Sequence, residues 1–122
     1  MSDEIPYQKI QASPWNRPVP EQFQLLRDRL DQLCRLPLTI HVLEEAISAA
    51  FAAYDRPFTM QLRENGEDKT LELQSGQGIG RKSLVIKLDI GRILIHELRL
   101  ADGWYFFEST NLAETAWWIA SS

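Results

Sequence analysis

Apolar and polar residues alternate along much of the second half of the chain, in runs interrupted by turn-forming residues. Because successive side chains of a strand point to opposite faces, a period of two predicts strands with one apolar face. Asn and Gly tolerate positive φ, so their pairs predict tight turns between the strands. The alternation predicts an antiparallel meander of four or five strands over about 57–109. The breaks that separate its strands are Asn65-Gly66, Gly76 to Gly80, Gly91 and Asp102-Gly103.

Two places in this meander need interpretation. Gly91 is either a turn or a bulge, and a single strand running through it would be unusually long, so a turn is favoured. In the segment after Gly91, alternate positions predict one shared apolar face that includes a histidine. The segment 104–108 is apolar on both faces, which predicts a central or helix-covered strand. The residues expected to share the histidine's face are Leu94, His96, Leu98 and Leu100.

Helical periodicity dominates the region before the meander. Spacings of three and four residues predict a helix over about 20–35, starting near Pro20 and ending before Pro37. A second helix over about 39–55 follows the same spacing, with Thr39 as its cap. After the meander, Asn111 and Glu114 resemble a capping box and predict a third helix over about 111–120. The apolar positions that carry the first two patterns are Phe23, Leu26, Leu30, Leu33, Leu43, Ala46, Ile47, Ala50, Phe51 and Tyr54.

Grouped helices and grouped strands, without strict alternation, predict an α+β fold. Residues 1–19 contain several prolines and little periodicity, so we expect an extended arm there. Residues 20–122 are expected to form a single α+β domain, with the sheet packed against all three helices.

Composition narrows the functional classes. The chain has 122 residues and a formal net charge of −4, spread evenly over its two halves. Such a charge disfavours nucleic acid as a partner. Cys34 is the only cysteine, which excludes an intramolecular disulfide and fits a reducing compartment. It lies on an apolar stripe and is expected to be buried. No apolar stretch is long enough to cross a membrane, so we expect a cytoplasmic protein.

No catalytic, cofactor or metal site is predicted. The stretch from Gly76 to Ser83 ends in Lys-Ser like a phosphate-binding loop, but Arg81 replaces the glycine that must precede the lysine. Its period of two also excludes the helix that such a loop needs. A weaker interpretation is an anion-binding nest at Arg81 and Lys82, and a mobile connection between strands is favoured over it. The two histidines, His41 and His96, cannot form a convincing zinc site.

Tryptophans supply the main functional clue. Trp117 and Trp118 are adjacent on a short predicted helix, so their side chains diverge by about 100° and one core can hardly bury both. Tryptophan is enriched at binding hot spots. Either the domain's own arm, anchored by Trp15, covers the second ring, or a partner does.

Three functional hypotheses follow. The first is a non-catalytic cytosolic protein that associates with a partner protein or with a second copy of itself, such as an adaptor, regulator or assembly factor; Trp15, Trp117 and Trp118 are its contact candidates. The second is single-stranded nucleic-acid binding by a basic and aromatic sheet face. The third is a small enzyme or ligand-binding protein centred on His96 with Glu97 or Glu108. The candidates for the second hypothesis are Arg81, Lys82, Lys87, Arg92 and Trp104.

Overall fold

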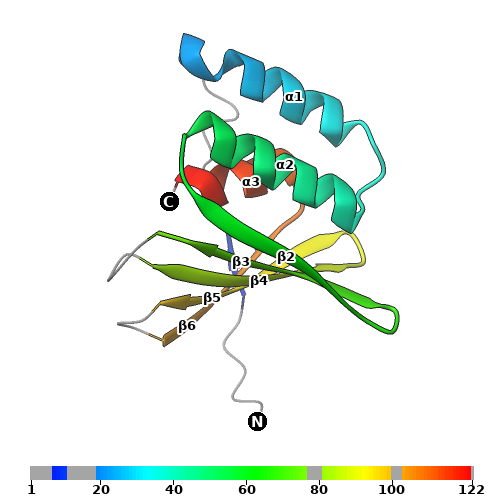
Figure 1. The fold of residues 1–122 in the computed structure, drawn as a ribbon. Coiled ribbons are helices and arrows are strands. Elements are labelled where there is room, and N and C mark those ends of the chain that lie inside the picture. The colour runs from blue at the N-terminus through cyan, green and yellow to red at the C-terminus, as the bar shows by residue number, and fades with distance from the viewer. Residues whose placement is uncertain (1–6, 11–18, 77–80, 100–102, 122) are drawn as a thin grey trace.

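The alternating region forms five strands, and a short sixth strand from the N-terminal segment joins them (Figure 1). The computed structural model describes residues 7–10, 19–76, 81–99 and 103–121. Its one sheet has the order β1-β6-β5-β4-β3-β2. The strands are β1 (Gln8–Lys9), β2 (Phe58–Asn65), β3 (Asp68–Ser75), β4 (Lys82–Asp89), β5 (Arg92–Arg99) and β6 (Gly103–Ser109).

The α+β class and the antiparallel meander are confirmed, because β2 to β6 pair in sequence order as neighbours. The strand number is higher than the predicted four or five. Gln8 and Lys9, within the predicted arm, pair in parallel with Phe107 and Glu108 of β6. Two residues are too few to show any periodicity, which is why this strand left no pattern in the sequence.

Glycines make the two tightest turns possible. Asn65 pairs with Asp68, so Gly66 and Glu67 form the two-residue turn between β2 and β3, and Gly66 adopts a φ of 67°. Asp89 pairs with Arg92, and Gly91 adopts a φ of 69° between β4 and β5. Both conformations favour glycine over residues with a Cβ atom. The prediction that Gly91 marks a turn is confirmed.

Three α-helices form close to the ranges predicted from the helical periodicity and, for the third, from the capping box. A 3₁₀ turn at Glu21–Phe23 leads into α1 (Gln24–Cys34), followed by α2 (Ile40–Ala53) and α3 (Leu112–Ser121). The Thr39 hydroxyl accepts a hydrogen bond from the Val42 amide at the start of α2. The Asn111 side chain accepts one from the Glu114 amide, 2.9 Å away, at the start of α3. Each side chain satisfies an amide that has no partner within its helix.

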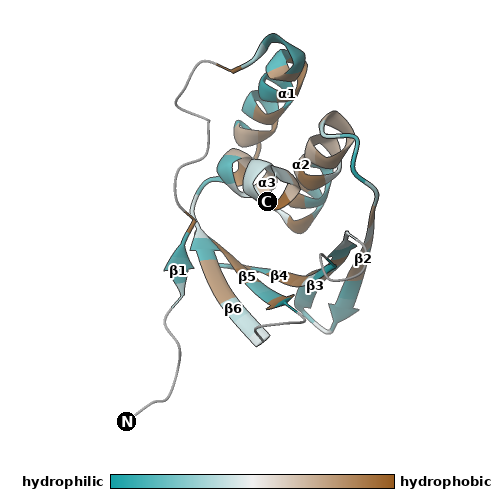
Figure 2. Ribbon diagram, turned by 90° about the vertical axis from the view of Figure 1, so that its left-hand side faces the viewer, coloured by the Kyte–Doolittle hydropathy of each residue, from teal (hydrophilic) through white to brown (hydrophobic). Residues whose placement is uncertain are grey.

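The helices all lie on one face of the sheet (Figures 1 and 2). α2 and α3 pack directly on the sheet, and α1 packs on these two helices. The apolar side chains of the helices and of this sheet face form one buried core. Burial of that apolar surface is the main stabilising contribution to the fold. We call the opposite side of the sheet, which no helix of the described residues covers, the open face.

The prediction that Cys34 is buried is wrong, whereas the shared face of Leu94, His96 and Leu98 is confirmed and is the face that the helices leave open; Leu100 lies outside the described residues. Cys34 is exposed, because it ends α1 beyond the buried stripe of Leu26, Leu30 and Leu33. In β5, the side chains that face the helices are Ile93, Ile95 and Glu97, whereas Leu94, His96 and Leu98 lie on the open face. Both faces of β5 are apolar, so alternation alone did not indicate which one the helices cover.

Candidate functional site on the open face of the sheet

The open face carries a group of apolar and aromatic side chains along β5 and β6. Leu98 pairs with Trp104, and His96 pairs with Phe106. Trp104 is 50% exposed, and the other side chains of the group are partly buried. We call this group the open-face strip and define it as Leu94, His96, Leu98, Trp104, Phe106 and Tyr7. The helices therefore cover the β6 face that carries Phe107, as predicted for the segment 104–108, and leave the face that carries Trp104 uncovered.

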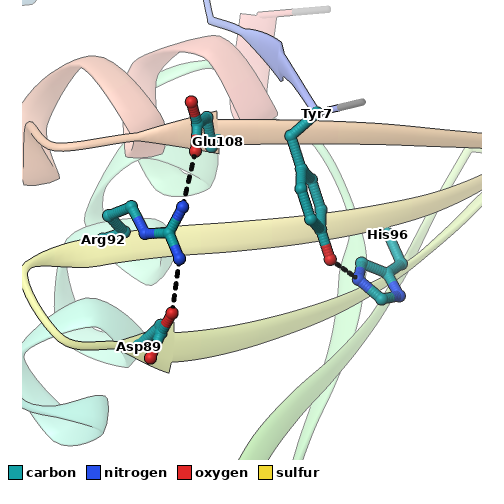
Figure 3. Close-up of polar contacts among 5 residues, drawn as sticks. All are labelled: Tyr7, Asp89, Arg92, His96 and Glu108. Carbon is teal, nitrogen blue, oxygen red and sulfur yellow. Dashed lines mark hydrogen bonds and ion pairs between the residues drawn. The ribbon is translucent and has the colours of Figure 1, made fainter. Parts of the chain in front are cut away.

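Tyr7 ties the N-terminal segment to this strip (Figure 3). Its hydroxyl lies 2.6 Å from Nε2 of His96. The Phe106 ring meets both the Tyr7 ring and the His96 ring edge to face, at centroid distances of 5.7 Å and 4.8 Å. Aromatic rings favour this arrangement because the positive edge of one meets the negative face of another. The three rings form a pre-organised aromatic surface.

The surroundings of His96 favour the neutral form of its ring. Partial burial lowers the pKa of the imidazole, and the nearby charge of Lys87 lowers this pKa further. A neutral ring can accept the hydrogen bond from the Tyr7 hydroxyl at Nε2. A histidine on an apolar strand face is by default expected to be buried, neutral and hydrogen-bonded. The hydrogen-bond partner of His96 is present, but the ring lies on the open face and is only partly buried.

A charged cluster closes one end of the strip (Figure 3). The Arg92 guanidinium binds the Asp89 carboxylate at 2.6 Å and the Glu108 carboxylate at 3.2 Å. These contacts link β4, β5 and β6 on the open face. They also occupy Glu108, which leaves it bound to Arg92 rather than to His96.

The basic residues predicted for nucleic-acid binding are divided between the two sides of the sheet. Lys87, Arg92 and Trp104 lie on the open face, where two carboxylates neutralise Arg92. Arg81, before β4, donates to the Gln74 side chain. Lys82 lies on the side of the helices, where burial lowers the pKa of its ammonium group and Glu97 opposes this effect. Of these four predicted cations, Lys87 is exposed on the open face beside the strip and has no ion pair among the described residues.

Glu97 carries a buried carboxylate, and the sequence pattern gives no indication of this burial. It is 3% exposed on the helix-covered face, and Arg99 binds it at 3.2 Å. The Arg99 guanidinium in turn lies 4.1 Å from the centre of the Tyr105 ring. His96 and Glu97, as neighbours in one strand, point to opposite faces, so they cannot act together as an acid–base pair. The i, i+2 spacing of Glu97 and Arg99 in a strand is the signal that could have indicated their pairing.

The three predicted contact tryptophans have different surroundings. Trp117 is 2% exposed and packs in the core against Phe23 and Tyr54. Trp118 is partly exposed, packs on Phe107 at a centroid distance of 4.7 Å, and lines an open cavity of about 610 Å³ next to Ile10. Trp15 lies outside the described residues. Of the two adjacent rings, the structure therefore leaves Trp118 accessible.

Other classes of site are not apparent in the described part of the chain. Within residues 7–10, 19–76, 81–99 and 103–121, no three His, Cys, Asp or Glu side chains cluster to hold a metal ion. In the same ranges, no helix has the length and apolar character needed to cross a bilayer.

Comparison with protein-family models, with curated proteins and with solved structures finds no match to this chain.

Proposed function

We propose that this chain is a non-catalytic cytosolic protein that acts by binding a partner protein through the open-face strip. The observation that carries the proposal is the half-exposed Trp104, which lies beside Phe106 and Leu98 on the sheet face that none of the described helices covers (Figure 2). Contiguous apolar surface of this kind marks interaction sites in soluble proteins. Tryptophan, with its large rigid ring, is the residue most enriched among binding hot spots.

The charges beside the strip indicate the chemistry of the partner. Lys87 is exposed next to Leu94, and Lys9 is exposed on β1. The described acids beside the strip are already paired, because Asp89 and Glu108 are bound to Arg92 and Glu72 is bound to Arg63. A partner segment with apolar anchor residues and an acidic flank would meet both the strip and these lysines. Such complementarity favours the correct orientation and speeds association.

Binding assays with three variants test this proposal. Trp104→Ala removes the exposed ring, Lys87→Glu reverses the adjacent charge, and Leu25→Ala removes an 84% exposed leucine from α1 as the matched control. Loss of a hot-spot tryptophan costs about 2 kcal/mol, so we expect roughly thirtyfold weaker binding for Trp104→Ala. Lys87→Glu should weaken binding as well, and Leu25→Ala should not. The partner is first captured from the native host and the affinities are then measured with purified components.

Two results would contradict the proposal. The first is equal partner affinity for the wild type and Trp104→Ala, which would place the contact elsewhere, with Trp118 as the next candidate. The second is retention on single-stranded oligonucleotides with a steep salt dependence and loss of retention in Lys87→Glu. That result would identify the strip as a nucleic-acid surface instead.

A further inference from the structure

The outer edge of the sheet at β2 has properties that the open face does not explain. β2 is eight residues long and, among the described residues, pairs only with β3, whereas β1 covers part of the opposite edge along β6. The strand contains neither proline nor glycine and pairs with β3 without interruption from Phe58 to Asn65. Long regular edge strands present unpaired backbone groups that can template pairing with another chain.

The apolar side chains of β2 are incompletely covered. Phe58, Met60 and Leu62 face the helices and are only partly buried, whereas Leu71 and Leu73, opposite them on β3, are fully buried. The helices therefore cover β3 completely and β2 incompletely. Additional structure beyond β2 would bury the rest of these three side chains.

The same three residues direct their backbone groups outward. The pair that flanks a two-residue hairpin turn exchanges both backbone hydrogen bonds, and this pair is Asn65 and Asp68. Hydrogen-bonded pairs alternate along the ladder, so Arg63, Gln61 and Thr59 point their N–H and C=O groups toward β3. The N–H and C=O groups of Phe58, Met60 and Leu62 consequently point away from β3, toward the free edge.

We propose that β2 pairs antiparallel with β2 of a second copy of this chain, with Met60 opposite Met60 of the second copy. In this register each Phe58 lies opposite a Leu62. The partly buried side chains of Phe58, Met60 and Leu62 from the two copies then form one continuous apolar stripe. Phe58, Met60 and Leu62 of each strand then all form hydrogen-bonded pairs. A two-fold axis requires such self-complementarity, because the same patch meets itself.

The position of Glu64 favours the same register. Glu64 follows Phe58, Met60 and Leu62 on the helix-covered side of β2, and it already pairs with Lys69 of β3 at 3.9 Å. Antiparallel pairing about Met60 keeps both Glu64 carboxylates beyond the ends of the apolar stripe. A register shifted by two residues would instead place Glu64 opposite Phe58 of the second copy.

The dimer would contain one continuous sheet with the helices of both copies on one side. The two open faces would then lie together on the other side. A partner with two binding segments could engage both strips at once, which raises its avidity without any new contact. The dimer itself does not depend on what the open face binds.

Sedimentation and cross-linking of the full chain test the proposal. We expect a monomer–dimer equilibrium in analytical ultracentrifugation. Met60→Pro removes an outward-directed N–H and a partly buried side chain but leaves the hydrogen bonds between β2 and β3 in place. Edge strands tolerate such a proline, so the variant should remain folded by circular dichroism and become monomeric. Gln61→Lys, whose side chain points to the open face, is the control and should still dimerise.

Cysteine variants test the register independently. In the proposed dimer Met60 and its counterpart form a hydrogen-bonded antiparallel pair. The Cα atoms of such a pair lie about 5.5 Å apart, within the range of a disulfide. In a Cys34→Ser background, Met60→Cys should form a covalent dimer under mild oxidation, and Leu62→Cys, which is out of register with itself, should not. This comparison decides the question even if Met60→Pro does not fold.

Three results would overturn the proposal. One is a wild-type chain that stays monomeric at every concentration reached. Another is a folded Met60→Pro variant that dimerises as well as the wild type, and the last is equal cross-linking of the two cysteine variants. Trp104→Ala, by contrast, is expected to leave the dimer intact.

Discussion

The Tyr7 hydroxyl and Nε2 of His96 lie 2.6 Å apart although 89 positions separate the two residues in the sequence. This contact joins the segment of β1 to the middle of β5 across the open face. The neighbouring backbone agrees with it, because the Ile10 amide donates to the Glu108 carbonyl at 3.0 Å. The N-terminal segment is thus held at two points on the sheet.

Removing the tyrosine hydroxyl should loosen this attachment. For Tyr7→Phe we expect a loss of about 1 kcal/mol in the free energy of unfolding, the usual net contribution of one hydrogen bond. Amide exchange of Ile10 should also become faster, because β1 opens more often. The matched control is Tyr54→Phe, another partly buried tyrosine that packs against Phe23 and lies far from β1 in the sequence. Unchanged exchange at Ile10 in Tyr7→Phe would contradict the prediction.

His96 should make the stability of the fold depend on pH. Burial and then Lys87 lower the pKa of His96 below its ordinary value of 6.5. The unfolded chain therefore binds the proton more strongly than the folded one, and stability is lost as the pH falls below 6.5 toward the folded pKa. Urea unfolding at a series of pH values measures this slope, which should be shallower in His96→Asn.

Lys87 contributes to that shift through the repulsion of like charges. In Lys87→Met the pKa of His96 should rise toward its ordinary value, because one of its two causes is gone. Titration of the imidazole signals by NMR measures the pKa directly. His41, for which no interaction with Lys87 is described, serves as the internal control. An unchanged His96 titration would exclude the role of Lys87.

The buried Glu97 should matter more than any exposed acid. Glu97→Gln removes the partner of Arg99 in a position that is 3% exposed, and we expect a loss of about 1–3 kcal/mol in unfolding free energy. The control is Glu72→Gln, which breaks the exposed Arg63–Glu72 pair and should cost less than about 1 kcal/mol. Equal losses in the two variants would show that the Glu97 pair behaves like a surface ion pair.

The three described tryptophans should contribute to the free energy of unfolding in the order of their burial. Trp117→Ala opens the core and should cost about 3–5 kcal/mol. Trp104→Ala removes a half-exposed ring and should change stability by about 0.5 kcal/mol or less, with Trp118→Ala between the two. Urea unfolding followed by far-UV circular dichroism gives all three values. A large loss for Trp104→Ala would mean that the open-face strip is part of the core.

Elements that depend on local patterns could be predicted from the sequence. Thr39 and Asn111 cap their helices as expected, and Gly91 forms the expected turn. In each case the signal lies within a few residues, where a side chain satisfies a backbone amide or permits a positive φ.

Features that depend on contacts between distant segments could not be predicted. β5 is apolar on both sides, Ile93 and Ile95 on one and Leu94 and Leu98 on the other, so only the position of the helices distinguishes its faces. The sequence pattern therefore does not predict the open-face strip. It places Trp104 only among the residues of a basic and aromatic face, and it gives no sign of Tyr7, because the partner of Tyr7 lies 89 positions away in the sequence.

The parallel pairing of Gln8 and Lys9 with β6 also constrains how the protein assembles during translation. The ribosome produces these two residues well before it produces Phe107 and Glu108, and the meander can form in order while they wait. The sheet is completed only when nascent β6 has emerged and the earlier segment returns to it. A pause in synthesis before β6 would therefore leave a four-stranded intermediate in which β2 and β5 are both unpaired edge strands.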